Sequence, residues 1–521
     1  MSAGLSDVCL VGQGLLSAYG AGVEICVDGL MSGRCAFTPA GERFPAPLAA
    51  LPLGVVPCDV FSPSSSNSRF MALLQALFAG STFPSDARVY VATTVGEITE
   101  LEDEVLSQIN GAFSPQGKGE CASLAHLPQR LAGVLNITAD HIQVVSSACA
   151  SSTVALALAS SAIRLGEISC ALVVGCCDTV SEFTLSGFAA LMAVDAEGAR
   201  PFDAARRGVT LGEVAVYALL MRRERAEQDG CPALGIIDGW GMTCDANHLT
   251  GPSRDGKPLA DAMQLALRMA DCQADDVVAI CAHGTGTVYN DQMEMLAFKD
   301  VFASRCVPVF SVKGGMGHTL GAAGLAEVLL SLAFLRRGCV PMTVGLKHTS
   351  VDAVGWATDR AHTVLSSGHI LTTNSGFGGI NAAVVLSLAS DVSLSPVDVG
   401  EKKTMCVSGR GCARAGLAVP EIVPFSLHRN FGRFSAEARL AFYAIAQALR
   451  DAHLNPMAAG TRVGIIAVDH DGCAAANRVY FSDYVQSGRV LGRGQLFVYT
   501  LPTSVAAECA IACHLVGPLC M

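Results

Sequence analysis

The sequence predicts an α/β fold built around a large, mainly parallel sheet that helices cover on both faces. Across residues 1–390, short β-branched runs alternate with runs rich in alanine and leucine. The β-branched runs are almost continuously apolar, which is typical of strands buried on both faces. The opening pattern of the chain also returns after residue 404, and such a repeat indicates the front part of a second unit.

Each expected element follows from its local pattern. The expected strands are apolar and β-branched, at 8–12, 88–94, 170–175, 214–220, 277–282, 307–312 and 381–388. The expected helices are long and alanine- or leucine-rich, at 151–166, 257–271 and 321–338. Residues 393–403 carry a proline, a glycine and several charges without periodicity, which predicts a linker.

Composition excludes several classes of protein. Of the 521 residues, 51% are apolar and 16% are charged, so the chain can bury a large core and is not disordered. The net charge of −11 argues against a nucleic-acid binder, which needs a basic surface. The 21 cysteines never form a C-x-x-C pair, so we expect reduced core cysteines rather than zinc sites or disulfides.

The expected location is the cytoplasm. The first residues, MSAGLSDVCL, lack the basic and apolar segments of a signal peptide. The longest apolar stretch, at 325–335, contains a charge and is too short to span a bilayer. We therefore expect no integral membrane segment.

Residues 404–521 repeat the opening of the chain in four blocks that keep their order. The matched pairs are 9–14 with 406–411, 69–77 with 439–449, 89–97 with 463–472, and 127–135 with 501–511. Leu127 lies 22 residues before Cys149, and the same offset from Leu501 points to position 523. The second copy is therefore expected to hold only a front segment without catalytic residues, either packed as a partner mimic, completed by a separate chain, or left as a degenerate tail.

Cys149 is the strongest candidate nucleophile. It follows an apolar strand and precedes an alanine-rich helix within SSACASS, so it lies at a sharp strand-to-helix turn. The amides and dipole at a helix N-terminus favour the thiolate, which is the nucleophilic form. Most other cysteines of this chain are expected to be core residues, and the turn distinguishes Cys149 from them.

Two histidines stand in glycine-rich segments after strands. His283 lies in AHGTGT, and His318 lies in SVKGGMGHTLGAAG together with Lys313 and, further along the helix, Glu327. A lone histidine is usually structural, but two histidines in such settings indicate a site. The segment NSGFGGINA at 374–382 is a glycine loop that no helix follows, so it does not suit phosphate binding.

Together these segments resemble the β-ketoacyl-acyl-carrier-protein synthases, the condensing enzymes of fatty-acid and polyketide assembly. SSACASS resembles the nucleophile motif of the family, HGTGT its first histidine motif, and K-x-x-x-GH-x-LGAAG its lysine and second histidine motif. RPFDAARRGVTLGE at 200–213 and GFGG resemble two further segments of the family. The resemblance covers about residues 7–390. It implies a thiolase-like fold of duplicated βαβαβ layers in the order α-β-α-β-α, with halves at 1–235 and 236–392, plus a partial thiolase-like segment at 404–521.

The resemblance also implies roles for individual residues. Cys149, His283, His318 and Lys313 would be catalytic, and the backbone of Cys149 and Phe377 would form the oxyanion hole beside the gating loop. The remaining implied site residues are the pantetheine contacts Thr285 and Thr287 and the supporting residues Glu327, Asp291 and Glu294. No metal or redox cofactor is implied, since substrates are carried on the phosphopantetheine of an acyl carrier protein.

Partners and alternatives follow from the same resemblance. We expect an acyl carrier protein and either a homodimer or pairing with another ketosynthase-like subunit. Arg206 and Arg207, with Arg130, are candidate carrier contacts, although a solvated turn explains the first two equally well. A thiolase is disfavoured because the loop GFGG lacks the second cysteine. A non-catalytic partner like a chain-length factor fits 404–521 better than 1–390, where Cys149 and both histidines are present.

Overall fold

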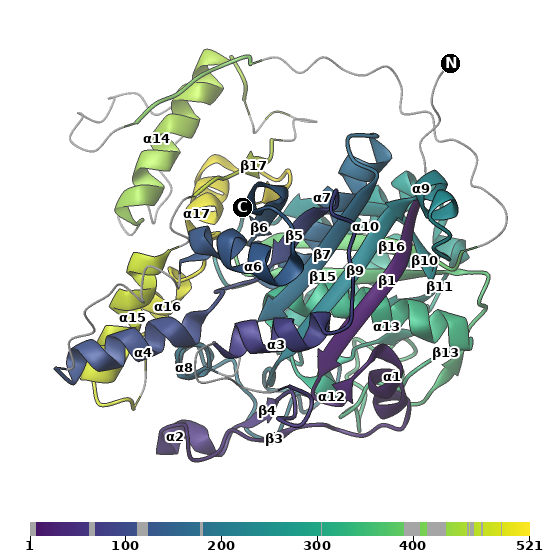
Figure 1. Ribbon diagram of the computed structural model, residues 1–521, viewed down its shortest axis with the longest axis horizontal. Coiled ribbons are helices and arrows are strands. Elements are labelled where there is room, and N and C mark those ends of the chain that lie inside the picture. Colours follow the sequence, from purple (N-terminus) through teal and green to yellow (C-terminus); the bar gives the residue numbers. More distant parts are fainter. Residues whose placement is uncertain are drawn as a thin grey trace.

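A large mixed sheet organises the protein (Figure 1). The computed structural model describes the following parts of the chain: residues 7–61, 68–111, 123–177, 181–303, 305–389, 407–413, 434–455, 458, 463–469, 473–490 and 492–520. The predicted linker at 393–403 lies outside these residues.

The large sheet consists of two five-stranded halves. One half has the order β6 (Ile142–Val145), β5 (Arg88–Ala92), β7 (Cys170–Cys177), β9 (Val214–Arg222) and β1 (Val8–Ser17). The other has the order β10 (Gly235–Cys244), β16 (Ile380–Ser387), β15 (His369–Gly376), β11 (Val277–Cys281) and β12 (Val309–Phe310). The antiparallel pair β1 and β10 joins them, with Cys9 opposite Ile236. The predicted boundary between the halves lies at the start of β10.

The expectation of a mainly parallel sheet was wrong. Only β5 and β11 lie between parallel neighbours, whereas the other pairings of the large sheet are antiparallel. For β15 and β16 the reason is local: a short glycine turn joins them, and such a turn forces the two strands to run in opposite directions.

Helices and sheets form the predicted sequence of layers. The central helices α7 (Ser151–Arg164) and α13 (Ala323–Arg337) contact each other and lie between the two halves of the sheet. One outer layer contains α10 (Lys257–Met269) and α11 (Val288–Phe302), and α10 packs on β10 and β16. The opposite layer contains α3 (Arg69–Phe78), on β1 and β9, and α6 (Leu127–Leu135), on β6. The duplicated α-β-α-β-α architecture is therefore confirmed.

Residues 7–389, which we call the first copy, also contain shorter elements. The short strands are β2 (Gly20–Ala21), β3 (Thr38–Pro39), β4 (Pro52–Gly54), β8 (Leu211–Gly212), β13 (Cys339–Val340) and β14 (His362–Thr363). The additional helices are α1 (Val23–Met31), α2 (Ala46–Ala49), α4 (Ile98–Ile109), α8 (Glu182–Ala190), α9 (Arg223–Gln228) and α12 (Lys313–Met316), with single turns at Leu124–His126, Ala139–His141, Ala274–Asp276 and Leu320–Ala322. No helix in the described ranges is long and apolar enough to cross a membrane.

Two glycines of β10 allow α10 to lie directly on the strand. A Cβ atom at Gly241 would lie 2.0 Å from the carbonyl oxygen of Ala262, and one at Gly239 would lie 2.3 Å from that of Ala266. Any side chain here would push the helix off the sheet. The same glycines interrupt the β-branched pattern, which is why the sequence did not predict this strand.

Residues 404–521 are called the tail, and its described residues fold as a partial second copy. Its elements are α14 (Ala436–Asp451), β17 (Ile465–Ile466), α15 (Ala474–Gln486), α16 (Gly494–Val498), α17 (Ser504–Cys513) and β18 (Leu519–Cys520). β17 and β18 form a parallel pair, as β5 and β6 do in the first copy. The helices α14, α15 and α17 follow the chain order of α3, α4 and α6.

The tail packs against the first copy through helices. Helix α15 lies on α4, which is its own counterpart in the first copy, and α16 lies on α8 (Figure 1). Near the end of the tail, the backbone N–H of Cys244 donates to the carbonyl oxygen of Val516 at 3.2 Å. Helix α15 therefore packs on the helix that holds the corresponding place in the first copy.

Candidate functional site

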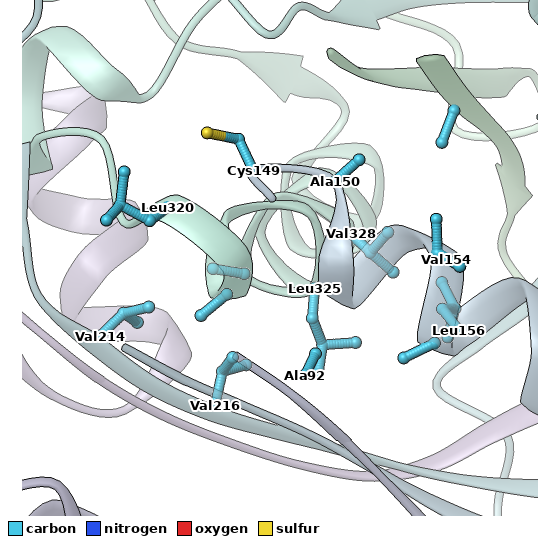
Figure 2. Close-up of a cluster of buried hydrophobic side chains, with 14 of the residues drawn as sticks. Ala92, Cys149, Ala150, Val154, Leu156, Val214, Val216, Leu320, Leu325 and Val328 are labelled. Carbon is cyan, nitrogen blue, oxygen red and sulfur yellow. The ribbon is translucent and has the colours of Figure 1, made fainter. Parts of the chain in front are cut away.

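Cys149 lies at a strained turn between β6 and α7. The preceding residue, Ala148, has a φ of 49°, a conformation that residues with a Cβ rarely adopt. The hydroxyl of Ser151, the first residue of α7, accepts a hydrogen bond of 2.8 Å from the N–H of Ser147 and stabilises the turn. Figure 2 shows the Cys149 thiol at the edge of a cluster of buried side chains, pointing away from most of them. Helix α7 begins at Ser151, two residues after Cys149.

His283 lies two residues after the end of β11 and is held by Glu294 of α11. The two carboxylate oxygens of Glu294 accept hydrogen bonds of 2.7 Å from the backbone N–H groups of His283 and Gly284. Burial, followed by the nearby charge of Asp291, raises the pKa of Glu294 to about 7. The buried carboxyl group therefore positions the histidine through the main chain.

His318 lies opposite His283. Its backbone N–H donates to the carbonyl oxygen of Thr210 at 2.7 Å, and its ring centroid lies 5.0 Å from that of His283, with the rings nearly perpendicular. Burial and the positive charge of Lys313 hold the pKa of both histidines well below its usual value. Both imidazoles are accordingly neutral near pH 7 and can each donate one N–H to a ligand.

A buried polar chain connects Lys313 to His283. The Nζ of Lys313 donates to Oε1 of Glu327, and Oε2 of Glu327 accepts a 2.8 Å hydrogen bond from the side chain of Asn374. The same amide nitrogen lies 3.4 Å from Nδ1 of His283. Burial raises the pKa of Glu327, while the Lys313 ammonium opposes this rise.

Asn374 is the member of this chain that sequence reasoning missed. It stands directly before the SGFGG loop, near the end of β15. The sequence pattern of this segment indicates only a glycine loop, and a single asparagine beside it has no distinct signature. Its Oδ1 accepts a hydrogen bond from the hydroxyl of Thr153 on α7. An asparagine two residues before the segment GFGG, which resembles a family segment, was the available signal.

Cys149, His283 and His318 line one cavity of about 500 Å³. The predicted residues Thr285, Thr287 and Phe377 also line it, so the structure brings together residues from four separate segments of the chain. The hydroxyls of Thr285 and Thr287 lie 2.9 Å apart. The described residues include no group of three or more histidine, cysteine or acidic side chains that could hold a metal ion.

Asp291 supports the cavity wall from behind. Its carboxylate accepts hydrogen bonds from the N–H groups of Phe202 and Gly286, at 2.9 and 3.3 Å. Burial raises its pKa to about 6, although these hydrogen bonds and Arg206 favour the charged form. Asp291 therefore links the loop after β11 to the segment at 200–213.

The loop between β15 and β16 lies against the nucleophile turn. A Cβ atom at Gly376 would lie 3.3 Å from the backbone nitrogen of Cys149, so only glycine permits this approach without displacement. The next residue, Phe377, stacks on Phe188 of α8 with a centroid distance of 5.9 Å. Gly378 has a φ of 93°, which completes the tight turn.

The predicted carrier contacts need a correction. Arg206 is only 6% exposed and pairs with Asp291 and Asp352, so burial prevents it from meeting a partner protein. Arg130 pairs with Glu97 at 2.6 Å. The Arg207 side chain, in contrast, is 69% exposed and lines the 500 Å³ cavity, with Glu197 at 3.4 Å. Of the three, Arg207 remains the accessible candidate.

Comparison with known proteins defines the family. The model for the N-terminal domain of beta-ketoacyl synthases matches residues 69–226, and the model for the C-terminal domain matches 234–347. These matches span about half of the chain and include Cys149, His283, Lys313 and His318. The protein belongs to the β-ketoacyl synthase family, whose members are generally condensing enzymes of the acyltransferase type.

Three particular proteins show how far the similarity extends. The 3-oxoacyl-acyl-carrier-protein synthase 2 of Rhizobium meliloti (strain 1021) is 27% identical, over 73% of this chain and 98% of its own. A type II polyketide ketosynthase solved with its acyl-carrier protein has a TM-score of 0.64 at 21% identity, covering 74% of this chain and all of its own. The PfaC ketosynthase–chain length factor has a TM-score of 0.77 at 16% identity and covers 99% of this chain and 70% of its own. The last match therefore includes the fold of the tail.

Proposed function

We propose that the protein catalyses a decarboxylative condensation between an acyl group held on Cys149 and a malonyl group held on an acyl carrier protein. The observation that carries the proposal is the meeting of one cysteine and two neutral histidines in a single cavity. The product would be a 3-oxoacyl thioester of fatty-acid or polyketide type.

In the first step, Cys149 exchanges thioesters. Its sulfur forms a bond to the acyl carbonyl carbon, the carbon–sulfur bond to the carrier breaks, and the carrier thiol leaves with a proton. The helix N-terminus of α7 favours the thiolate. The backbone N–H groups of Cys149 and Phe377 would donate hydrogen bonds to the oxyanion, and the close approach of Gly376 to Cys149 supports this role.

In the second step, His283 and His318 act on the malonyl thioester. Because both imidazoles are neutral, each can donate an N–H to the thioester carbonyl as the carboxylate leaves as carbon dioxide. The resulting enolate carbon attacks the acyl group on Cys149, and the carbon–sulfur bond breaks to free the thiolate. Lys313 and Glu327, with Asn374, would orient His283.

The cavity also suits a carrier-bound substrate. Thr285 and Thr287 present hydroxyls along the route between Cys149 and the exposed side chains of Tyr289 and Arg207. A phosphopantetheine arm has amides that can pair with such hydroxyls. The proposal needs no metal or redox cofactor, because every step is a group transfer, and the cytoplasmic location remains a prediction.

The domain assignment is part of the same proposal. The halves 1–235 and 236–392 would supply Cys149 and the two histidines respectively, and the tail would be non-catalytic. The tail carries no residues that match the histidine motifs. A role for residues 1–390 as a non-catalytic chain-length-factor-like partner is less well supported, because Cys149, His283 and His318 are all present.

Intact-mass measurement of the protein tests the proposal. Incubation with an acyl carrier thioester should add one acyl group to the wild-type protein and none to the Cys149→Ala variant. Condensation with malonyl carrier should disappear in the same variant, with the melting temperature little changed. Condensation by Cys149→Ala at the wild-type rate would refute the assignment.

A further inference from the structure

The rim of the 500 Å³ cavity is mostly apolar. Of the described residues that line the cavity, three are large, apolar and exposed: Met192 at 89%, Tyr289 at 72% and Val288 at 41%. Single exposed apolar side chains are normal on a protein surface, but several around one cavity indicate a binding surface. We call Met192, Val288 and Tyr289 the apolar rim.

Met192 occupies a position that favours glycine. It lies two residues after the end of α8 and has a φ of 54°, in the left-handed region. Its N–H donates to the carbonyl oxygen of Ala189 at 2.9 Å. The N–H of Ala193 donates to the carbonyl oxygen of Phe188 at 3.1 Å. Glycine is the usual residue in this helix-ending motif because it has no Cβ. A large apolar side chain here costs stability and is surrounded by water, so its presence points to a role outside folding.

The charges beside the apolar rim are offset. Arg207 is the one described cavity-lining residue with a permanent positive charge, and Glu197 lies 3.4 Å from it. Glu197 also pairs with Arg200 at 3.1 Å. The whole chain carries a net charge of −11, so its overall charge does not attract an anionic partner. Affinity at this rim must therefore come mainly from its apolar surface.

We propose that an acyl carrier protein docks on the apolar rim through apolar side chains that surround its prosthetic arm. The inference rests on the proposed function. The exposed side chains of the rim mark where the cavity meets solvent, so the arm passes them on its way to Cys149. The protein that bears the arm then covers the rim. Covering it removes apolar area from water, which gives an affinity that depends little on salt.

Two butyryl donors test the inference. One is butyryl on a purified type II acyl carrier protein, and the other is butyryl N-acetylcysteamine thioester, which has no protein to dock. In both reactions the butyryl group moves to the Cys149 sulfur and the donor leaves as its free thiol, so intact mass reports the rate. Met192→Gln and Val288→Thr keep the size of the side chain and remove its apolar character. Each should raise the ratio of the carrier KM to the soluble-thioester KM about threefold or more.

Salt separates apolar docking from charged docking. Between about 0.05 and 0.5 M sodium chloride, the KM for the butyryl carrier should change less than about twofold, because salt does not screen the burial of apolar area. Arg207→Gln should likewise raise this KM less than Met192→Gln does. A KM that rises about tenfold or more with salt would show that charges dominate the docking and would overturn the inference.

Met192→Gly separates docking from folding. Because glycine suits the φ of 54°, the melting temperature should not fall, while the KM ratio should increase as it does in Met192→Gln. Leu365 and Val351, which are 71% and 92% exposed and do not line the cavity, provide matched controls. Leu365→Gln and Val351→Thr make similar chemical changes elsewhere on the surface and should leave the KM ratio at the wild-type value.

The outcomes distinguish the two proposals. If the wild-type protein accepts butyryl from neither donor, the proposed function fails. If it accepts butyryl from the soluble thioester but not from the carrier, the inference about the rim fails and the acylation of Cys149 stands. The inference also fails if the rim variants and the two control variants share one KM ratio.

Discussion

The side chain of Asn374 donates a 2.8 Å hydrogen bond to Glu327, the carboxylate that pairs with Lys313 deep in the protein. Because the same nitrogen lies 3.4 Å from Nδ1 of His283, the buried ion pair is connected to the imidazole through one amide. The side chains of Lys313 and Glu327 are each 1% exposed, so water does not compete for these contacts. The orientation of His283 therefore depends on residues outside the cavity.

Asn374→Ala should slow decarboxylation more than acyl loading. Loss of the amide frees the His283 ring and removes a donor from Glu327, which should reduce carbon dioxide release by about 10–100-fold. Acyl loading on Cys149 depends on the thiolate and the oxyanion hole and should change less. Release of labelled carbon dioxide and intact mass measure the two steps.

Ser387→Ala provides a control for this variant. It removes a hydrogen bond of 3.1 Å to Asp238 on the same sheet, away from the cavity. It should leave both steps intact. Equal losses in decarboxylation and loading for Asn374→Ala would contradict the role in orienting His283.

His283 and His318 should stay neutral well below pH 6.5. Burial and the Lys313 charge lower the pKa of each imidazole, so protonation must occur at a lower pH than in an unfolded chain. Nitrogen NMR of histidine-labelled protein should show neutral tautomers for both rings at pH 6. The His283→Gln and His318→Gln variants assign the signals, and titration of either ring near 6.5 would overturn the electrostatic account.

Glu294 should make stability depend on pH. Its pKa is raised from 4.5 to about 7 in the folded state, so between these values the folded protein binds a proton that the unfolded chain lacks. Stability from this group therefore rises as pH falls from 8 to 5, by at most about 1.4 kcal/mol per pH unit. The melting temperature of wild type minus that of Glu294→Gln should increase over this range.

The histidines and Asp291 also make stability depend on pH in this range, because the histidines of the unfolded chain ionise near pH 6.5, so the difference between wild type and variant is the useful quantity. The buried neutral histidines lose stability as pH falls, and Asp291, with a pKa raised to about 6, gains it. The contributions of the histidines are present in both proteins and largely cancel in the difference, whereas Asp291, whose charge acts on Glu294, contributes to it. A difference in melting temperature between wild type and Glu294→Gln that stays constant with pH would show that Glu294 is ionised throughout this range.

Removal of the tail should expose an apolar surface that promotes self-association. Phe183 is fully buried beneath tail side chains, so deletion of residues 404–521 uncovers an aromatic patch on α8. We expect concentration-dependent self-association, measured by light scattering after size-exclusion chromatography. A soluble, fully active homodimer would show that the tail is dispensable and that a second copy can replace it.

Tyr480→Ala weakens the contact between the tail and α8 in the full-length chain. A fully buried aromatic side chain truncated to alanine costs about 3–5 kcal/mol, and here it also leaves the hydroxyl of Ser186 without its tail contact. Urea unfolding should show the tail released first. A single unchanged transition would contradict the packing described above.

Several elements could be predicted because their signal is local. The turn around Cys149 and the long helices α7, α10 and α13 follow from apolar periodicity and small residues, and all lie where expected. Strand β10 was missed because Gly239 and Gly241, which admit α10, carry no side chain to mark a strand. The antiparallel pairings were missed because strand direction depends on connections that periodicity does not describe.

The sequence by itself determined the family, the candidate residues Cys149, His283 and His318, and the repeat in residues 404–521, since each is encoded in short contiguous segments. Only the tertiary structure decided that Asn374 joins His283 to Glu327, that Arg206 is buried on Asp291, and that the tail presents Phe497 to Cys149. These relationships join side chains that lie far apart along the chain. Their geometry depends on how the layers of helices and strands pack. A contact between two distant side chains leaves no periodic pattern in the sequence, so the sequence does not reveal it.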